Sequence, residues 1–413
     1  MIPKRDAGSR TRAAVLLAAA LAVMVTAGAR PLGVPETAYS RSTGAPPMFL
    51  EHLTLAFLYP SYTALLPAHV FGSAARYEEE LALSAVIKGG RHRFFVLSQP
   101  WKEGSLGTSR GFPRERAPTL QVGWSANAGG ARLGAAVRGT SLRTAESDDS
   151  RRPSSAYLRE SDEHIRYIEL GGGLGAGSGE NSAELVLAHR LVKSDAADVS
   201  FDSGVYSDSL VFGLESKDVR QWSVALRVRI GIGRRSCLTA AGAWHGLQQK
   251  WSAYIYTDEW IQEMEVDPYG DLWQAGVLLK TAVRHADSVA VGVDYESLRS
   301  PWASLDTRMV ALRFDQVRTA RLHLTLWRPL YGDVNMQAGL RKSYSWDESN
   351  SRRVTVSGND LRFERRSNKL EILSDRFSWG LAMKWRRLDV RGAVSTTLDL
   401  DDFFWAVDVM FAL

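Results

Sequence analysis

The last eleven residues of the chain, from Phe403 to Leu413, alternate between apolar and mixed positions. The apolar positions all share one parity, and they are Phe403, Trp405, Val407, Val409, Phe411 and Leu413. A period of two indicates a β-strand with one apolar face. In an outer-membrane barrel the last strand closes the ring while its outer face contacts lipid, so this ending predicts a transmembrane β-barrel.

The same alternation recurs upstream, most clearly in 222–232, 289–296, 379–386 and 388–400. A soluble β-sandwich would cover such faces with a second sheet, whereas a barrel exposes them to acyl chains. The sequence therefore predicts an all-β fold, a closed antiparallel transmembrane β-barrel. We expect about 14 strands, with roughly 12–16 allowed, because closed bacterial barrels have an even number of strands.

Two kinds of connection separate these segments. Tight turns are expected near 88–91, 128–130, 233–236 and 284–287, where glycine and polar residues cluster. Long polar stretches follow the other strand ends, at 98–117, 144–161, 194–219 and 346–375. Short turns on one side and long loops on the other are typical of outer-membrane barrels, so we expect the long loops to be external.

The N-terminal residues 1–29 are predicted to be a secretory signal peptide. Four basic residues precede an apolar run from Ala13 to Val25, and small residues follow at Ala27 and Ala29. A membrane-anchor helix is the less favoured interpretation, because the run is shorter than the roughly 18 residues that a spanning helix needs. Export by the general secretory route then predicts a location in the bacterial outer membrane.

Composition limits the partners and the chemistry. Removing residues 1–29 would lower the formal net charge from +5 to +2, so the basic composition gives no argument for a nucleic-acid partner. Cys237 is the only cysteine, which excludes an intrachain disulfide and a cysteine-rich metal site.

The expected organisation has three parts. After the signal peptide, residues 30–80 form an N-terminal extension, and residues 81–413 form the barrel. Within the extension, 51–80 is apolar but interrupted by Pro60 and Pro67. This segment is either a short helical plug in the barrel mouth or a first strand plus a helix.

One stretch resembles a known group of proteins. Residues 56–66, Ala-Phe-Leu-Tyr-Pro-Ser-Tyr-Thr-Ala-Leu-Leu, are similar to the F-x-N-P-A-x-x-L element near the N-terminus of FadL-like and PorV-like outer-membrane barrels. Tyr59 stands where that element has asparagine. The resemblance implies a barrel of about 14 strands with an N-terminal plug.

Charged residues opposite the apolar faces are candidates to line the lumen. The candidates are Arg138, Arg227, Arg229, Asp294, Glu296, Arg313, Lys384, Arg386 and Arg391. One interpretation is a charge ladder that favours anions or amphipathic solutes with acidic heads. The other, favoured because both signs are present, is internal ion pairing in a filled barrel.

Alternating glycines form a second candidate feature, namely Gly171, Gly173, Gly175, Gly177 and Gly179. Their spacing does not match the G-x-G-x-x-G fingerprint of dinucleotide-binding loops. A glycine stripe on a strand marks a bend or the close approach of another element. We therefore expect contact with a plug or plain curvature, and FadL-like barrels add the prospect of a strand kink that opens a lateral exit.

No catalytic, metal-binding or cofactor-binding residue is predicted. The eight histidines match neither H-E-x-x-H nor H-x-x-E-H, and G-x-S-x-G is absent from the sequence. We expect no enzymatic activity, although outer-membrane lipases can use a Ser–His pair that only the folded chain brings together.

Three functions remain open from the sequence. The favoured one is passive transport of a small amphipathic or hydrophobic solute. The alternatives are a non-conducting barrel in assembly, secretion or surface attachment, and an outer-membrane lipid-modifying enzyme. The expected partners are outer-membrane lipid and lipopolysaccharide, the barrel-assembly machinery through the C-terminal strand Phe403 to Leu413, and a small-molecule solute.

Overall fold

The computed structural model describes residues 38–43, 45, 47–50, 55–75, 80–99, 119–152, 155–203, 209–256, 261–266, 269–284, 287–306, 309–357, 360–397 and 403–413. Four short helical segments come first: α2 (Ala38–Thr43), η1 (Pro47–Phe49), α3 (Leu55–Leu58) and η2 (Pro60–Leu65). The strands follow in the order β1 (His69–Ala75), β2 (Glu80–Gly89), β3 (His92–Gln99), β4 (Thr119–Ala128), β5 (Ala131–Arg152), β6 (Ser155–Ser178), β7 (Asn181–Ser203), β8 (Ser209–Ile232), β9 (Ser236–Tyr256), β10 (Ile261–Val266), β11 (Tyr269–Arg284), β12 (Asp287–Asp306), β13 (Met309–Tyr331), β14 (Val334–Ser357), β15 (Asp360–Trp385), β16 (Leu388–Thr397) and β17 (Phe403–Ala412). Within the described ranges, no helix is both long and apolar enough to cross a membrane.

The sheet closes on itself, because β1 pairs with both β2 and β17 in antiparallel fashion. Both β10 and β11 pair with β9, β10 with residues 251–256 and β11 with residues 236–248. They therefore share one place in the ring, and the seventeen segments form a closed barrel of sixteen strands. The predicted fold class is confirmed, with two strands more than the best estimate of about 14.

The barrel begins earlier than the expected boundary at Leu81. Its first strand, β1, carries the outward-facing Val70, which is 47% exposed. The neighbouring Phe71 is buried and packs against Ala56 and Leu66 of the helical segments. A large apolar residue on the inner face reverses the usual outward pattern, which is why the sequence left a first strand here as one of two interpretations.

The expected tight turns at 88–91, 128–130 and 233–236 are confirmed by the ends of the strands that flank them. Gly90, Gly129, Gly130 and Gly233 have positive φ angles there, which glycine adopts without steric cost. The fourth expected turn, 284–287, lies partly outside the described residues.

Three of the expected long loops are strands instead. The stretches 144–161, 194–219 and 346–375 lie largely within the hairpins β5–β6, β7–β8 and β14–β15. Beyond the membrane both faces of a strand meet water, so the apolar alternation ends while the backbone pairing continues. Beyond Gln99, the expected loop 98–117 lies outside the described residues.

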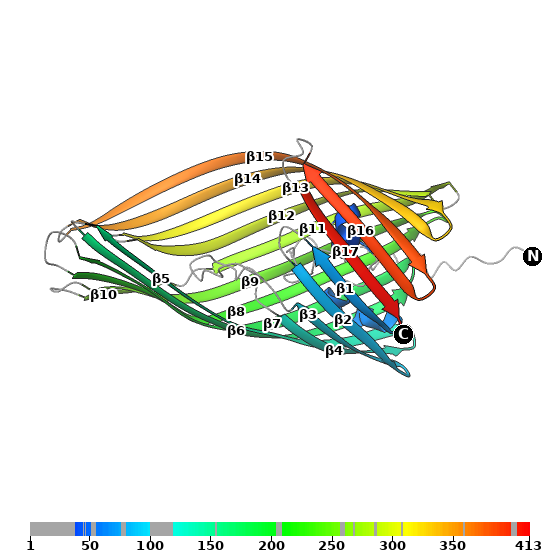
Figure 1. Ribbon diagram of the computed structural model, residues 1–413, viewed down its shortest axis with the longest axis horizontal. Helices are drawn as coiled ribbons and strands as arrows, with labels where there is room; N and C mark the ends of the chain where they lie inside the picture. Colours follow the sequence, from blue (N-terminus) through cyan, green and yellow to red (C-terminus); the bar gives the residue numbers. More distant parts are fainter. Residues whose placement is uncertain are drawn as a thin grey trace, which may run out of the picture.

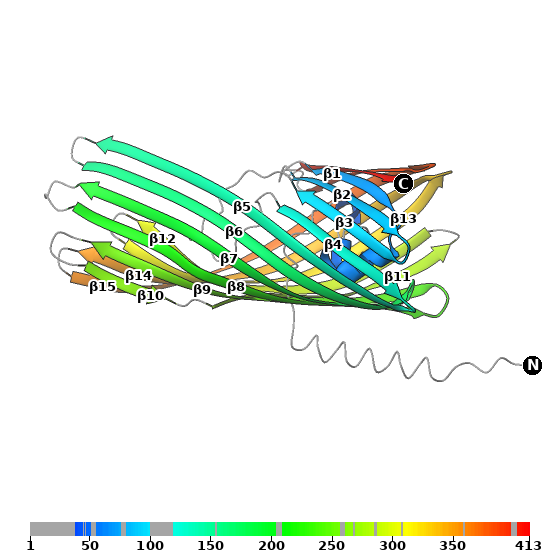
Figure 2. The same ribbon diagram turned by 90° about the horizontal axis from the view of Figure 1, so that it is seen from below.

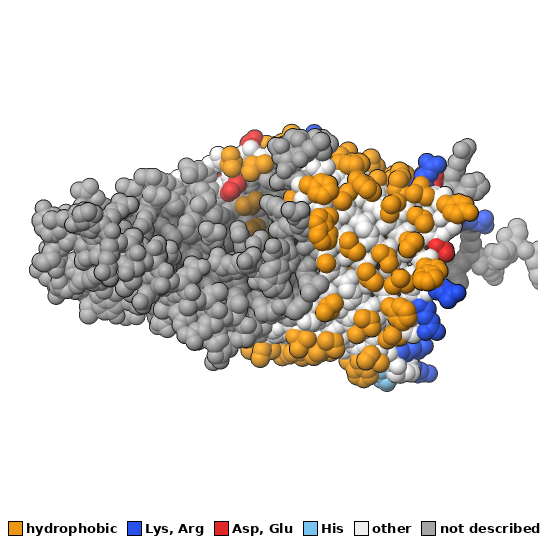
Figure 3. All heavy atoms as spheres, in the orientation of Figure 1, with side chains coloured by type: hydrophobic (Ala, Val, Ile, Leu, Met, Phe, Trp, Pro, Cys, Tyr) orange, Lys and Arg blue, Asp and Glu red, His pale blue; other side chains and the backbone are white. Residues whose placement is uncertain are grey.

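The face of the barrel drawn in Figure 3 carries an apolar band near its turn end. On the outer face of β13, exposed Arg318 and Arg328 bracket Leu322 and Leu324, which are 50% and 45% exposed. Ten residue steps at about 3.4 Å each, tilted by about 40°, span about 26 Å. This height matches the apolar band of about 25 Å that outer-membrane barrels present to lipid.

The wall of the barrel differs greatly in height around the ring (Figures 1 and 2). Strands β16, β17 and β1 to β4 have 7 to 10 residues each. Strands β5 to β9 and β12 to β15 have 20 to 26 residues and extend far beyond them. One side of the described barrel therefore has a low rim.

Replacing Leu324 with arginine tests the depth of the apolar band. The charge would lie near its middle, so we expect a loss of folding free energy of about 2–4 kcal/mol in lipid vesicles. Leu330→Arg is the matched control, because Leu330 lies next to the turn and a charge there costs about 0–1 kcal/mol. Equal losses for both variants, measured by reversible urea unfolding, would contradict the placement of the band.

Candidate functional site

The helical segments lie inside the barrel, at the end that carries the short turns (Figures 1 and 2). We call residues 38–66 the inner segment. Buried residues of η1 and α3, with Tyr59, form an apolar core with inward-facing residues of five strands. The core contains Met48, Phe49, Leu55, Leu58, Tyr59, Val186, Ala225, Ala241, Ala243, Leu278 and Ala290. The alanines keep the wall thin where the inner segment packs, and β12 comes within 8 Å of β7 and β8 between Cα atoms.

Glycines on the inner face of the wall make room for the inner segment. A Cβ atom at Gly134 would overlap the backbone at Ser61, and one at Gly173 would press against Ser61 at 3.3 Å. Gly339 likewise faces the backbone of Thr43. A larger side chain at these positions would push the inner segment away from the wall.

A buried ion pair holds the middle of the inner segment. Glu184 of β7 pairs with Arg132 of β5 and accepts a hydrogen bond from Ser61 Oγ at 2.5 Å. The side chains of Arg132 and Glu184 are 2% and 1% exposed. Arg227 of β8 donates from Nε to the carbonyl oxygen of Met48 at 3.0 Å. These contacts join the wall to the inner segment at two points.

Two tyrosines of the inner segment face these charges, and both tyrosines are neutral. Burial raises the pKa of both Tyr59 and Tyr62 above its ordinary value. The Arg227 guanidinium lowers both pKa values, but desolvation is the larger effect. The charges at this contact therefore belong to the wall, and the inner segment meets them with neutral groups.

A second contact fixes the start of the inner segment at the place where the barrel closes. Asp408 of β17 accepts hydrogen bonds from the backbone N–H groups of Ala38 and Tyr39, at 2.9 and 3.2 Å. It also accepts one from Ser73 Oγ of β1 at 2.7 Å. The guanidinium of Arg391 lies 4.9 Å from the centre of the Tyr39 ring. Asp408 thus joins the last strand, the first strand and α2.

Farther from the turns, a polar row crosses the inner face of five strands. The strand register aligns Gln121, Arg138, Glu169, Arg190 and Gln221 side by side on β4 to β8. Arg190 Nη2 lies 2.7 Å from Glu169 Oε2, and Arg138 Nη2 donates to Gln121 Oε1 at 3.1 Å. Gln221 is fully buried, and neither its amide nitrogen nor its amide oxygen has a hydrogen-bond partner in the described part of the chain.

A row of small side chains lies next to the polar row. It contains Ala136, Gly171, Ala188 and Ser223, which the register aligns on β5 to β8. Successive rows on one face of a sheet are two residues apart along each strand. The inner face of β5 to β8 therefore presents a small, mostly apolar strip beside a strip of charges and amides.

The opposite part of the wall carries an acidic cluster with its own cations. Asp294 of β12 contacts Arg321 Nη1 at 2.9 Å, Gln274 Nε2 at 3.2 Å and the Nε2 atom of His323. Glu296 lies 2.9 Å from the same Arg321 nitrogen. The two carboxylates of this cluster are therefore balanced by Arg321 within the wall.

The structure divides the predicted lumen residues into two groups. Arg138, Arg227 and Asp294 are buried inside, and Arg229, Glu296 and Arg391 are partly buried there. Arg229 Nη1 donates to the carbonyl oxygen of Gly179 at 3.0 Å, and Arg391 Nη2 lies 2.8 Å from Asp389.

The remaining predicted lumen residues lie elsewhere. Arg386 is in the exposed turn between β15 and β16, with φ at 51°, so it does not line the lumen. The alternation in the sequence continued past the last strand residue and concealed this turn. Lys384 is exposed at the same end of the barrel. The side chain of Arg313 lies outside the described residues.

The glycine stripe spans two environments. Gly173 faces Ser61 of the inner segment, and Gly175 leaves space for the Arg132–Glu184 pair. Gly177 and Gly179 have positive φ angles at the β6–β7 turn. Through Gly171 to Gly177 the pairing of β6 with β5 and β7 has no interruption, so the described wall has no lateral opening at the stripe.

The sequence alone did not single out several residues of these contacts, namely Glu169, Glu184, Arg190, Arg321 and Asp408. Each alternates with outward-facing apolar residues, which is a usable signal for an inner position. Their partners lie on neighbouring strands, and pairing them requires the register of each hairpin. That register depends on the exact turn residues.

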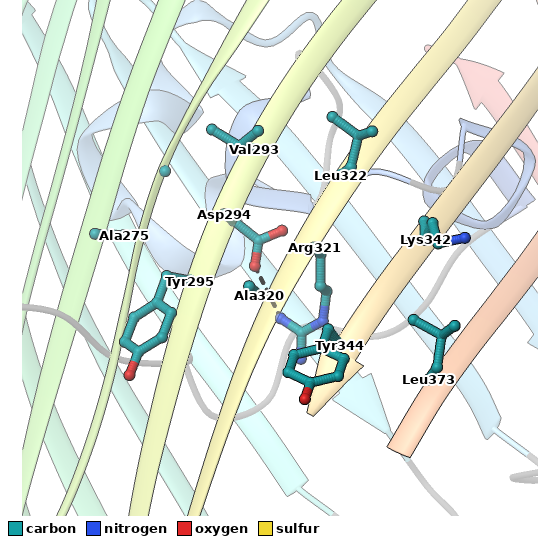
Figure 4. Close-up of a pocket in the computed structure, with 11 residues that line it drawn as sticks. Ala275, Val293, Asp294, Tyr295, Ala320, Arg321, Leu322, Lys342, Tyr344 and Leu373 are labelled. Carbon is teal, nitrogen blue, oxygen red and sulfur yellow. Dashed lines mark hydrogen bonds and ion pairs between the residues drawn. The ribbon is translucent and has the colours of Figure 1, made fainter. Parts of the chain in front are cut away.

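The outer face carries a depression of about 490 Å³ over β11 to β15 (Figure 4). Small side chains at Ala275 and Ala320 lie among larger ones such as Tyr295 and Tyr344. The strand pairing behind it is unbroken, because Asp294 pairs with Gly276 on one side and with Arg321 on the other. The depression therefore does not perforate the wall.

One serine–histidine contact lies on the inner face. Ser223 Oγ of β8 hydrogen-bonds to Nδ1 of His245 on β9. A hydrolase also needs N–H donors for the oxyanion, but β8 is paired with β7 and β9 here, and those ladders use its backbone N–H groups. Within the described ranges, no three His, Cys, Asp or Glu side chains gather as a metal site.

Neither a protein-family model nor a curated protein sequence matches the chain. Solved outer-membrane structures are similar at low identity. The toluene transporter TodX of Pseudomonas putida has 9% identity and a TM-score of 0.42, over 92% of this chain and 99% of TodX. CdiB from Acinetobacter baumannii has 9% identity and a TM-score of 0.39, over 83% of this chain.

The chain spans 59% of the length of CdiB. The alcaligin receptor FauA from Bordetella pertussis has 10% identity and a TM-score of 0.30, over 83% of this chain and 75% of FauA. Likeness at this level carries no argument about function, so the assignment rests on the chain's own geometry. Its closed strand pairing, apolar band and internal charges make it a sixteen-stranded transmembrane β-barrel of the outer-membrane type.

Proposed function

We propose that the barrel is a passive route through the outer membrane for a small amphipathic solute, and that the inner segment is its gate. The observation that carries this proposal is the pair of adjacent strips on the inner face of β5 to β8. The row from Ala136 to Ser223 is small and mostly apolar, and the row from Gln121 to Gln221 is polar. A solute with an apolar body and a polar head complements both strips at once.

Gln221 is the best candidate within these strips for contact with the head group. A fully buried amide without a partner costs folding free energy, about 1–3 kcal/mol by mutational estimates. A solute that donates to its oxygen or accepts from its nitrogen would satisfy it.

The inner segment must move for any solute to pass along the barrel axis. Three charged residues of the wall hold it through polar contacts: Glu184 accepts from Ser61, Arg227 donates to the Met48 carbonyl oxygen, and Asp408 accepts from Ala38 and Tyr39. None of these contacts is an ion pair between the segment and the wall, because the charges lie on the wall. Release of the segment leaves Glu184 paired with Arg132, whereas Arg227 and Asp408 lose partners that lumen water would have to replace.

A second candidate function is a non-conducting barrel that acts in assembly, secretion or surface attachment. The observation that favours it is the packed turn end of the lumen, where the inner segment fills the space between alanine-rich walls and β12 lies close to β7 and β8. If the inner segment is a gate, it leaves the lumen under some condition, whereas a permanently packed segment keeps the lumen closed.

Conductance of the Glu184→Gln variant separates these functions. Losing the carboxylate leaves Arg132 without its charged partner while the docked inner segment keeps it buried, at a cost of about 3–5 kcal/mol. Release of the segment would relieve this cost, because lumen water could then reach Arg132. In planar bilayers the variant should open far more often than the wild type. Glu348→Gln is the matched control, because Glu348 is 3.9 Å from the exposed Lys369 and that pair contributes about 0–1 kcal/mol.

Ser61→Ala is the milder companion, since it removes one hydrogen bond to Glu184 and leaves the ion pair intact. Heat-modifiable migration of each variant in SDS gels reports whether the barrel has folded. Silent bilayers with folded wild type, Ser61→Ala and Glu184→Gln would contradict the transport proposal and support the non-conducting barrel.

Uptake of the fluorescent probe N-phenyl-1-naphthylamine tests the amphipathic route, because its aromatic body carries one N–H donor. Cells that express the protein should take up the probe faster than cells without it. Gln221→Leu should slow uptake about two- to tenfold, the effect of one hydrogen bond. Ser84→Ala is the control, because Ser84 is a buried polar residue of β2, away from β5 to β8. Equal uptake by all three proteins would contradict the role of Gln221.

A further inference from the structure

Exposed basic side chains gather at the turn end of the barrel, beside the place where β17 meets β1. They lie at the β2–β3 turn and at the β15–β16 turn, and we call them the basic arc: Lys88, Arg91, Lys384, Arg386 and Arg387. The two turns lie on either side of β17 and β1, within a run of six neighbouring strands from β15 through β17 and β1 to β3. In Figure 3 basic side chains line this end, directly beside the apolar band.

The charges of the basic arc are not balanced within the described part of the chain. None of its five residues has a described carboxylate within 4.0 Å, unlike the lumen residues Arg132, Arg190, Arg321 and Arg391. Two acidic side chains lie on the same strands near this end. Asp389 pairs with Arg391, and Asp408 is buried against α2. The arc therefore presents uncompensated positive charge to its surroundings.

Apolar side chains on the same strands continue up to the basic arc and fix its depth. Ile87 precedes Lys88 and is 60% exposed, and Trp385 follows Lys384 and is 62% exposed. The guanidinium of Arg386 lies 5.6 Å from the centre of the Trp385 ring. Because acyl chains cover the exposed apolar residues, the layer that meets the basic residues beside them is the layer of lipid phosphates.

We infer that the basic arc binds anionic phospholipid headgroups in the leaflet on the turn side of the membrane. An acidic protein surface is the weaker candidate, because the two turns that carry the basic residues border lipid-facing side chains. Five exposed basic residues lie at the two turns of the arc, whereas the β8–β9 turn carries two, Arg234 and Arg235. The turns β6–β7 and β13–β14 carry exposed acidic residues, Glu180 and Asp333.

The same six strands include the low side of the wall. The shortest of these six strands, β1, has seven residues, fewer than the roughly 9–11 that usually cross a bilayer. Headgroups bound to the arc would hold the membrane boundary at this short wall. This inference does not depend on solute transport.

Spin-labelled lipids test the inference with the full chain reconstituted in phosphatidylcholine. Labelled phosphatidylglycerol should associate with the protein several-fold more strongly than labelled phosphatidylcholine at about 10 mM salt. The ratio of the two association constants should approach one at about 1 M salt, where the Debye length falls to about 3 Å. The lipopolysaccharide-free bilayer excludes that anionic lipid as the source of the effect.

Neutralising the arc should abolish the preference. The variant combines Lys88→Gln, Arg91→Gln, Lys384→Gln, Arg386→Asn and Arg387→Gln, with asparagine at 386 because it tolerates the positive φ angle there. The control neutralises the exposed basic residues of another turn, with Arg234→Gln and Arg235→Gln. A retained preference in the arc variant overturns the inference, and so does an equal loss in the control.

Discussion

In the core of a lipid bilayer there is no water to bind a backbone N–H or carbonyl group that lacks a hydrogen-bond partner. Each such group costs several kcal/mol. A sheet in this environment must therefore have no edges. Here the requirement is met where β1 pairs with β17, and every other feature depends on that closure. The closed ring gives each strand an outer face for lipid and an inner face where arginine, glutamate and glutamine can be buried in pairs.

Alternation in the sequence was sufficient to predict the closed barrel, because the last strand and the segment 222–232 each separate apolar from polar side chains by parity. Alternation failed to predict a strand where one of its faces contacts something other than lipid or the polar lumen. In β1 the inner segment takes Phe71 on the inner face, and in the long hairpins water meets both faces. In both cases the backbone pairing that defines the strand leaves no trace in side-chain polarity.

The lumen was less accessible to prediction than the wall. Single charges such as Arg138 and Arg227 could be assigned to the inner side, but their partners Gln121 and the carbonyl of Met48 could not. Those contacts join residues that the register, or the path of the inner segment, brings together from distant parts of the chain. The strand register and the path of the inner segment also decide whether the barrel is a channel or is filled. The sequence therefore left the two functions open.

Asp408 has a consequence for the order of assembly. It bonds to α2, which precedes the barrel in the chain, and to Ser73 of β1, while it belongs to the final strand. The inner segment therefore gains this anchor only when the two ends of the barrel meet. Ring closure and formation of this anchor are one event, which takes place at the seven residue pairs that join β1 to β17.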